Sequence, residues 1–204
     1  MMSKIVLVGA TGTIGSVVYS KLINNGHNVI TTSLSGHLTD YSLDISDITS
    51  IMDVFKDIST FDALISTTGK VVFRDIDKLT QDDWQLSLNN KLLGQINLVQ
   101  EGARYINKNG SFTLTTGILN VVPIKMGGTA STVNAGLEGF IKSASLEYDD
   151  FRINAVSPTV VKEALYKYAS YFKGFVPVNA VDVANAYLKS ISCDLNGEVL
   201  KVGF

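Results

Sequence analysis

Short apolar runs alternate along the chain with stretches in which apolar residues recur every three or four positions. The runs have the length of strands and are apolar at consecutive positions, as in strands whose two faces are both covered. They occupy residues 4–9, 27–33, 61–69, 111–117, 152–158 and 198–202, and a shorter one is expected at 41–44. The periodic stretches, typical of amphipathic helices, occupy residues 14–25, 47–55, 80–106, 126–148 and 181–191. This alternation predicts an α/β fold, a doubly wound parallel sheet in a single domain over residues 1–204.

Residues that begin or end helices stand at several of these boundaries. Asn25–Gly26 is typical of the C-terminal end of a helix, and Asp47 and Thr80 are typical helix N-caps. Asn109–Gly110 predicts the end of the long helix that begins at Thr80.

The composition excludes several classes of protein. Hydrophobic residues make up 46% of the chain and charged residues 18%, which provides a sizeable core, and the net charge is −2 without any Lys/Arg cluster that would suit nucleic acid. One cysteine, Cys193, and two histidines argue against a disulfide framework and a metal site. No apolar run approaches the roughly 18 residues of a membrane span, and five apolar residues after Lys4 are too few for a signal peptide. We therefore expect a cytoplasmic protein that does not bind membranes.

A glycine-rich loop follows the first predicted strand and opens the first predicted helix. Glycines at such a junction allow a tight turn and bring backbone N–H groups close to a pyrophosphate, and the helix N-terminus adds partial positive charge. The spacing Gly-x-x-Gly-x-x-Gly differs from the usual Gly-x-Gly-x-x-Gly, and a glycine turn needed only for packing is the alternative. The loop predicts dinucleotide binding in a Rossmann fold, with these candidate contacts: Gly9, Thr11, Gly12, Thr13, Ile14 and Gly15.

The end of the second predicted strand bears on the choice between NAD(H) and NADP(H). An acidic residue there would bind the ribose 2′-hydroxyl and repel a 2′-phosphate, but the chain has no carboxylate until Asp40. Ser33 and Ser35 could donate hydrogen bonds to a 2′-phosphate, assisted by His37, although no Arg or Lys is present. The pattern favours NADP(H) over NAD(H), and the alternative is a simple polar turn.

From this loop to the last strand, the order of motifs resembles the short-chain dehydrogenase/reductase family. Asp44 and Ile45 stand where that family contacts the adenine ring. Arg152–Pro158 resembles the strand before the family's Pro-Gly corner, where Pro158 and Thr159 would lie beside the nicotinamide. A Thr-rich segment replaces the family's Asn-Asn-Ala-Gly over the adenine ribose: Ser66, Thr67, Thr68 and Gly69.

The resemblance is weakest at the catalytic positions. The family uses a Tyr-x-x-x-Lys motif, a serine and an asparagine, and the spacing of the motif places its two side chains on one face of a helix. Alignment of Ala135–Phe140 with the family puts Ala130 at the tyrosine and Asn134 at the lysine. Thr116 takes the place of the serine and keeps a hydroxyl, and Lys91 takes the place of the asparagine.

Three hypotheses follow from this departure. The first is an NADP(H)-dependent oxidoreductase that acts on a small carbonyl or alcohol substrate, with Thr116 and Lys91 as catalytic residues, although Lys91 could equally be a surface lysine. The second is an inactive NADP(H)-binding sensor or scaffold, since loss of an acid–base group typically costs roughly 10²–10⁴-fold in rate. The third is a protein whose site binds an unrelated small molecule.

The resemblance also implies features beyond the site. The family pairs subunits through its two long helices, so a homodimer or homotetramer is expected. Residues 162–175 stand where the family covers its substrate, and Tyr166, Tyr168 and Tyr171 would either line a pocket or bury their rings in an amphipathic helix.

Overall fold

A seven-stranded parallel sheet forms the centre of the molecule, in a computed structural model that describes residues 2–204. The strand order is β3-β2-β1-β4-β5-β6-β7, and every pairing is parallel. The strands span Lys4–Val8 (β1), Asn28–Ser33 (β2), Tyr41–Ser42 (β3), Phe61–Ser66 (β4), Ile106–Thr115 (β5), Phe151–Pro158 (β6) and Val199–Val202 (β7). The order reverses between β1 and β4, which is where doubly wound sheets bind their ligands. The predicted fold class is confirmed.

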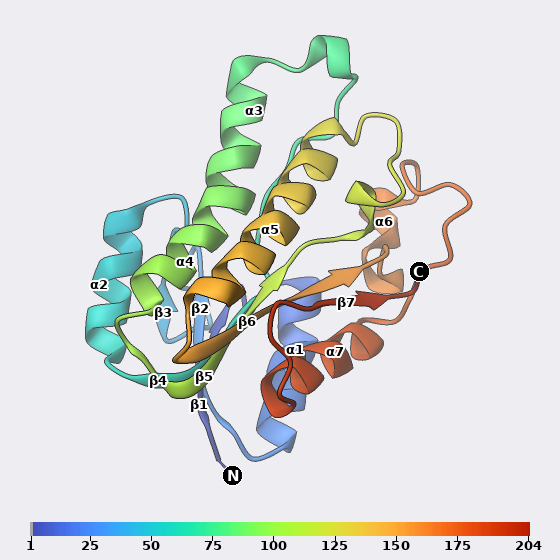
Figure 1. Cartoon of the computed structure of the whole chain (residues 1–204). Coiled ribbons are helices and arrows are strands. Elements are labelled where there is room, and N and C mark those ends of the chain that lie inside the picture. The colour runs from blue at the N-terminus through green and yellow to red at the C-terminus, as the bar shows by residue number, and fades with distance from the viewer. Residues whose placement is uncertain (1) are drawn as a thin grey trace.

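Helices cover both faces of the sheet (Figure 1). One face carries α2 (Ile48–Ile58), α4 (Gly94–Gly102) and α5 (Gly128–Glu147), and the other carries α1 (Thr13–Asn24) and α7 (Ala180–Ser192). The helix α3 (Gln81–Ser87) continues into α4 through a π-helical turn, η2 (Leu88–Leu93), and α6 (Leu165–Tyr168) lies beside the carboxyl edge of the sheet. Short 3₁₀ turns complete the chain: η1 (Ile76–Lys78), η3 (Ile118–Asn120) and η4 (Lys162–Ala164). No helix within residues 2–204 is long and apolar enough to cross a membrane.

Each face of the sheet buries its own apolar layer. Phe55, Phe61 and Phe112 are fully buried in the layer under α2, α4 and α5. Ile5, Leu7 and Tyr187 are fully buried in the layer under α1 and α7. Because consecutive strand residues enter opposite layers, the strands read as continuous apolar runs, which is the pattern from which they were predicted.

Most of the predicted helix ends are confirmed. Asp47 accepts a hydrogen bond from Thr49 N at 2.9 Å and caps α2, and Thr80 forms a reciprocal capping box with Asp83 at the start of α3. The first helix ends at Asn24, and Gly26 adopts a left-handed conformation with φ of +79°.

The predicted end of the long helix is wrong. The helix ends at Gly102, not near Ile106, and β5 already begins at Ile106. Gly102 allows the aromatic ring of Phe112 to pack directly against the helix backbone, since a β-carbon there would lie 2.9 Å from that ring. Asn109, expected to follow the helix, instead adopts a left-handed conformation inside β5, with φ of +65°. Tertiary packing of the strand outweighed the local signal.

The glycine loop brings the first strand, the first helix and β4 into close contact. Gly9 has φ of +86°, a conformation that glycine adopts without strain. A β-carbon on Gly15 would overlap the carbonyl oxygen of Gly9 and lie 2.8 Å from Thr67 Oγ1. The start of α1 can therefore approach the end of β1 only with glycine at position 15.

This contact predicts different effects for two alanine substitutions. Gly15→Ala should lower the free energy of unfolding by about 1–3 kcal/mol through overpacking. Gly139→Ala, on α5, is the matched control, because a β-carbon there meets nothing within 4 Å and alanine favours a helix by about 0.5–1 kcal/mol. Denaturant unfolding measures both variants, and equal stabilities for the two would contradict the packing role of Gly15.

Candidate active site

Two adjoining hollows form a groove along the carboxyl edge of the sheet. The outer hollow lies between the glycine loop and the ends of β2 and β3, and it includes Ser33, Leu34, Asp44 and Asn90. The inner cavity, of about 300 Å³, lies beyond β4 and is lined from the ends of β5 and β6 and from η2, α5 and α6. Both are lined by four residues: Thr67, Thr68, Gly69 and Tyr168.

Most of the site residues predicted from the sequence line this groove. The outer hollow is lined by Gly9, Thr11, Gly12, Ser33, Asp44 and Ile45. The inner cavity is lined by Thr13, Ile14, Lys91, Thr116, Pro158 and Thr159. Thr67, Thr68 and Gly69 stand between the two. Segments that are far apart in the sequence therefore meet at the switch point of the sheet.

Three predicted contacts do not line the groove. Gly15 is buried against the glycine loop, as described above. Ser66 is fully buried in β4, and its carbonyl oxygen accepts a hydrogen bond from Thr115 Oγ1. Ser35 is exposed beyond β2, and its hydroxyl accepts a hydrogen bond from His37 N at 3.3 Å.

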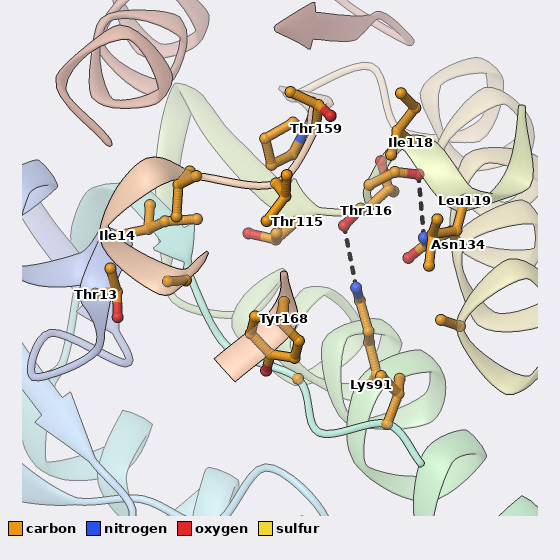
Figure 2. A pocket seen from close by; sticks show the side chains of 18 of the residues that line it. Thr13, Ile14, Lys91, Thr115, Thr116, Ile118, Leu119, Asn134, Thr159 and Tyr168 are labelled. Carbon is orange, nitrogen blue, oxygen red and sulfur yellow. Dashed lines mark hydrogen bonds between the residues drawn. The ribbon is translucent and has the colours of Figure 1, made fainter. Parts of the chain in front are cut away.

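The π-helical turn η2 places two neighbouring residues in the groove. Asn90 lines the outer hollow, where its Oδ1 accepts a hydrogen bond from Lys70 N at 2.6 Å. Lys91 lines the inner cavity, and its Nζ donates to the carbonyl oxygen of Thr116 at 3.0 Å (Figure 2). π-helical turns contain an additional residue and often mark functional sites.

Neighbouring residues fix the position of Lys91. A β-carbon on Gly69 would lie 2.6 Å from Lys91 Cγ, so glycine leaves the space that the lysine stem occupies. Gln95, fully buried one turn later, donates to the carbonyl oxygens of Lys91 and Thr115 and accepts from Thr115 N. These contacts tie the helix backbone at Lys91 to the end of β5.

Burial around the ammonium changes its acidity. The removal of water lowers the pKa of Lys91 from 10.5 to about 8, because desolvation disfavours the charged form. A lysine with such a pKa is still mostly protonated at neutral pH, and it releases its proton more readily than a solvated lysine. Lys91 is half-buried, and its ammonium is enclosed at the cavity instead of being fully solvated as on an open surface.

The helix α5 supplies the other polar groups of the inner cavity. Ala130 and Asn134 line the cavity one turn apart, and Asn134 Nδ2 donates to the carbonyl oxygen of Gly117 at 3.0 Å (Figure 2). Thr116 lines the same cavity, but its hydroxyl donates to the Glu138 carboxylate at 3.3 Å. The polar groups that line the cavity are thus one ammonium, one carboxamide, the hydroxyl of Tyr168 and threonine hydroxyls.

Two buried oxygen atoms at this cavity have no hydrogen-bond partner in the structure. Asn134 Oδ1 and Thr159 Oγ1 are both inaccessible to solvent, in residues that are 2% and 4% exposed. Buried polar atoms without partners are uncommon in folded proteins, and these two belong to residues that line the inner cavity.

Two residues that contact this site, Gln95 and Glu138, were not predicted from the sequence. Gln95 is a polar residue among the apolar positions of the long helix, and this interruption was the available signal for its buried role. Glu138 and Asn134 are four positions apart on α5, a spacing that places them on the same helix face. Only the structure shows which of the three predicted tyrosines belongs to the site. Tyr168 lines both hollows, whereas Tyr166 is exposed and Tyr171 packs on Phe73.

A sequence model of the family described as enoyl-(acyl carrier protein) reductase matches residues 12–192. The short-chain dehydrogenase/reductase ucsE from Acremonium sp. is 24% identical over 108 residues, which cover 52% of this chain and 41% of that protein. The chain belongs to the short-chain dehydrogenase/reductase family. The matched part spans less than half of ucsE, so the activity of that whole protein does not transfer.

Several solved structures have the same architecture over nearly the whole chain. The protein lin1944 from Listeria innocua is 40% identical, with a TM-score of 0.94 and coverage of 98% of this chain and 99% of that chain. A small-chain dehydrogenase in complex with NADPH is 27% identical, with a TM-score of 0.87 and coverage of 99% and 97%. A short-chain dehydrogenase from Burkholderia cenocepacia in complex with NADP, 19% identical with a TM-score of 0.87 and coverage of 97% and 95%, shares the fold.

The environment of Lys91 predicts a measurable titration. In protein labelled with ¹³C-lysine, one lysine side-chain resonance should titrate with a midpoint of about pH 8, and this resonance should be absent from Lys91→Met. Titration of the Lys91 resonance at its ordinary value of 10.5 would show that its ammonium is solvated and contradict the enclosure.

Proposed function

We propose that this protein is an NADP(H)-dependent oxidoreductase that transfers hydride between the nicotinamide and a small carbonyl or alcohol substrate. The observation that carries the proposal is the half-buried Lys91, whose ammonium lies in the inner cavity and donates to the carbonyl oxygen of Thr116 at 3.0 Å, next to the outer hollow of the groove. It provides a proton donor and positive charge in a site whose helix has Ala130 in place of the family tyrosine.

The residues of the groove fit a dinucleotide along its whole length. In the outer hollow, the glycine loop would bind the pyrophosphate, and Asp44 and Ile45 would contact the adenine ring. The inner cavity has the unpartnered Asn134 Oδ1 and Thr159 Oγ1 for the hydroxyl and carboxamide groups of a nicotinamide riboside. When bound, the nicotinamide would supply or accept the hydride.

The outer hollow supports a preference for the 2′-phosphate. Asp44 is the one carboxylate that lines this hollow within residues 2–204, and its Oδ1 already accepts hydrogen bonds from Ser46 N and Ser46 Oγ. Leu34, directly after β2, stands where an acidic residue would select NAD(H), and Ser33 lines the hollow beside it. Position 34 therefore carries no charge that would repel a 2′-phosphate.

Lys91 would protonate or polarise the substrate oxygen. Its ammonium uses one hydrogen bond on Thr116, which leaves two donors for a substrate carbonyl. In reduction, the carbonyl carbon gains hydride and the oxygen gains a proton from Lys91, which recovers it from solvent. Apolar side chains around the cavity, including Phe73 and Phe172, exclude water and strengthen this interaction.

Thr116 would position the substrate oxygen beside Lys91. Its hydroxyl is held by Glu138 in this structure, and a carbonyl oxygen in the cavity could take over that donor. An inactive NADP(H)-binding sensor is a second candidate function. The hydroxyl of Thr116 already donates to Glu138, and Ala130 has no group that could act as an acid.

The proposal includes a homodimer formed through the long helices. The α3–α4 segment and α5 run side by side on one face of the molecule (Figure 1), and Leu86, Leu93 and Leu146 are exposed there. Exposed leucines on neighbouring helices favour pairing with a second copy.

The catalytic role predicts the effect of removing the ammonium. Lys91→Met should lower the rate of NADPH-dependent carbonyl reduction by about 10²–10⁴-fold, because proton transfer by a positioned acid contributes that much. Wild-type turnover should be constant below about pH 8 and fall above it, since the acid works only while Lys91 keeps its proton. NADPH oxidation with a panel of aldehydes, ketones and quinones measures both.

The controls separate the two candidate functions. Lys91→Arg keeps the charge and should shift the fall in activity to higher pH, because arginine stays protonated. Turnover that is unchanged in Lys91→Met would remove Lys91 from the mechanism. Binding of NADPH without turnover of any carbonyl in the panel would favour the sensor.

The nucleotide preference predicts the effect of an added carboxylate. Leu34→Asp should weaken NADPH binding by at least tenfold and leave NADH binding unchanged or tighter, because the carboxylate would repel a 2′-phosphate and accept from a 2′-hydroxyl. Leu34→Asn is the uncharged control. Calorimetric titration measures each Kd, and tighter NADH than NADPH binding by the wild type would contradict the preference.

A further inference from the structure

Among residues 2–204, no carboxylate forms an ion pair with Lys91. Lys91 is the one charged side chain that lines the inner cavity within residues 2–204, and no described carboxylate lies within 4.0 Å of its Nζ. Glu138, on α5, instead accepts the hydroxyl of Thr116. Charges withdrawn from water are normally paired, so this ammonium, held by the carbonyl oxygen of Thr116, leaves a net positive charge at the cavity.

The walls of the cavity do little to screen that charge. The side chains around it are mainly aliphatic and aromatic: Val71, Phe73, Ile118, Leu119, Val160, Val161, Ala164 and Phe172. The carboxamide of Asn134 and the Lys91 ammonium point toward neighbouring carbonyl oxygens of the same segment, and the hydroxyl of Tyr168 belongs to the same cavity (Figure 2). In such surroundings charges interact far more strongly than they do in water.

The two redox forms of the cofactor differ in charge at one place. The nicotinamide ring is positively charged in NADP⁺ and neutral in NADPH, while the adenosine, the phosphates and both riboses are the same. If the cofactor lies along the groove as in the proposed function, on which this inference rests, the ring enters the cavity that Lys91 lines.

We propose that Lys91 makes this site discriminate between the redox forms and bind NADPH in preference to NADP⁺. The ammonium repels the oxidised ring and leaves the reduced ring unaffected, so the loaded protein carries reducing equivalents and releases the oxidised cofactor. The site is thereby biased toward reduction of its substrate. This assigns Lys91 a role in cofactor selection that is independent of proton transfer.

Calorimetric titration of the full-length protein with NADPH and with NADP⁺ tests the proposal without a substrate. The wild type should bind NADPH on the order of tenfold more tightly than NADP⁺, as expected for one unpaired charge near the ring. Lys91→Met should bring the two Kd values within about threefold, chiefly by tightening NADP⁺ binding. Lys91→Arg, which keeps the charge, should preserve the preference.

A second lysine of the groove supplies the matched control. Lys70 lines the outer hollow, beside the part of the cofactor that is identical in both forms. Lys70→Met should therefore change the affinity for NADPH and NADP⁺ by the same factor and leave their ratio unchanged. Comparison of the Kd ratios of Lys91→Met and Lys70→Met separates the effect on the nicotinamide ring from the general effect of losing one positive charge near an anionic cofactor.

The outcomes distinguish this inference from the function on which it rests. A Kd ratio near one in the wild type, or a ratio that is the same in wild type and Lys91→Met, overturns the redox discrimination and leaves NADP(H) binding in place. A failure of the wild type to bind either form overturns the proposed function, and the discrimination with it.

Discussion

The close approach of the glycine loop to the end of β4 determines where this molecule can hold a ligand. Thr67 donates its backbone N–H to the carbonyl oxygen of Val8 at 2.8 Å, and its hydroxyl donates to the carbonyl oxygens of Val8 and Gly9. Gly15 brings α1 against the same point. Because three segments converge on so few atoms, the backbone at the switch point is fixed, and the groove opens on either side of it.

Two side chains from different helices hold the end of β5 at the inner cavity. A lysine on η2 and an asparagine on α5 each bind one carbonyl oxygen at the end of β5, those of Thr116 and Gly117. The cavity therefore has a cation on the wall formed by η2 and a carboxamide on the wall formed by α5, and α5 contains no tyrosine.

The position of the charge has two consequences with one physical cause. Desolvation lowers the pKa of Lys91 to about 8, which improves it as a proton donor near neutral pH. The same removal of water leaves its charge poorly screened and sensitive to the charge of any neighbouring ring. Gln95 and Gly69, which hold and accommodate the lysine, are therefore as much a part of the site as Lys91 itself.

The sequence by itself determined the alternation of strands and helices, the glycine loop and the order of the segments around the groove. These features are local, because periodicity and turn residues depend on neighbours within a few positions. Only the tertiary structure decided that the long helix ends at Gly102, where Phe112 packs against it, and that η2 places both Asn90 and Lys91 in the groove. The burial of Lys91 and the unpartnered oxygen of Asn134 likewise depend on β5, α5 and α6, which meet only in the folded chain.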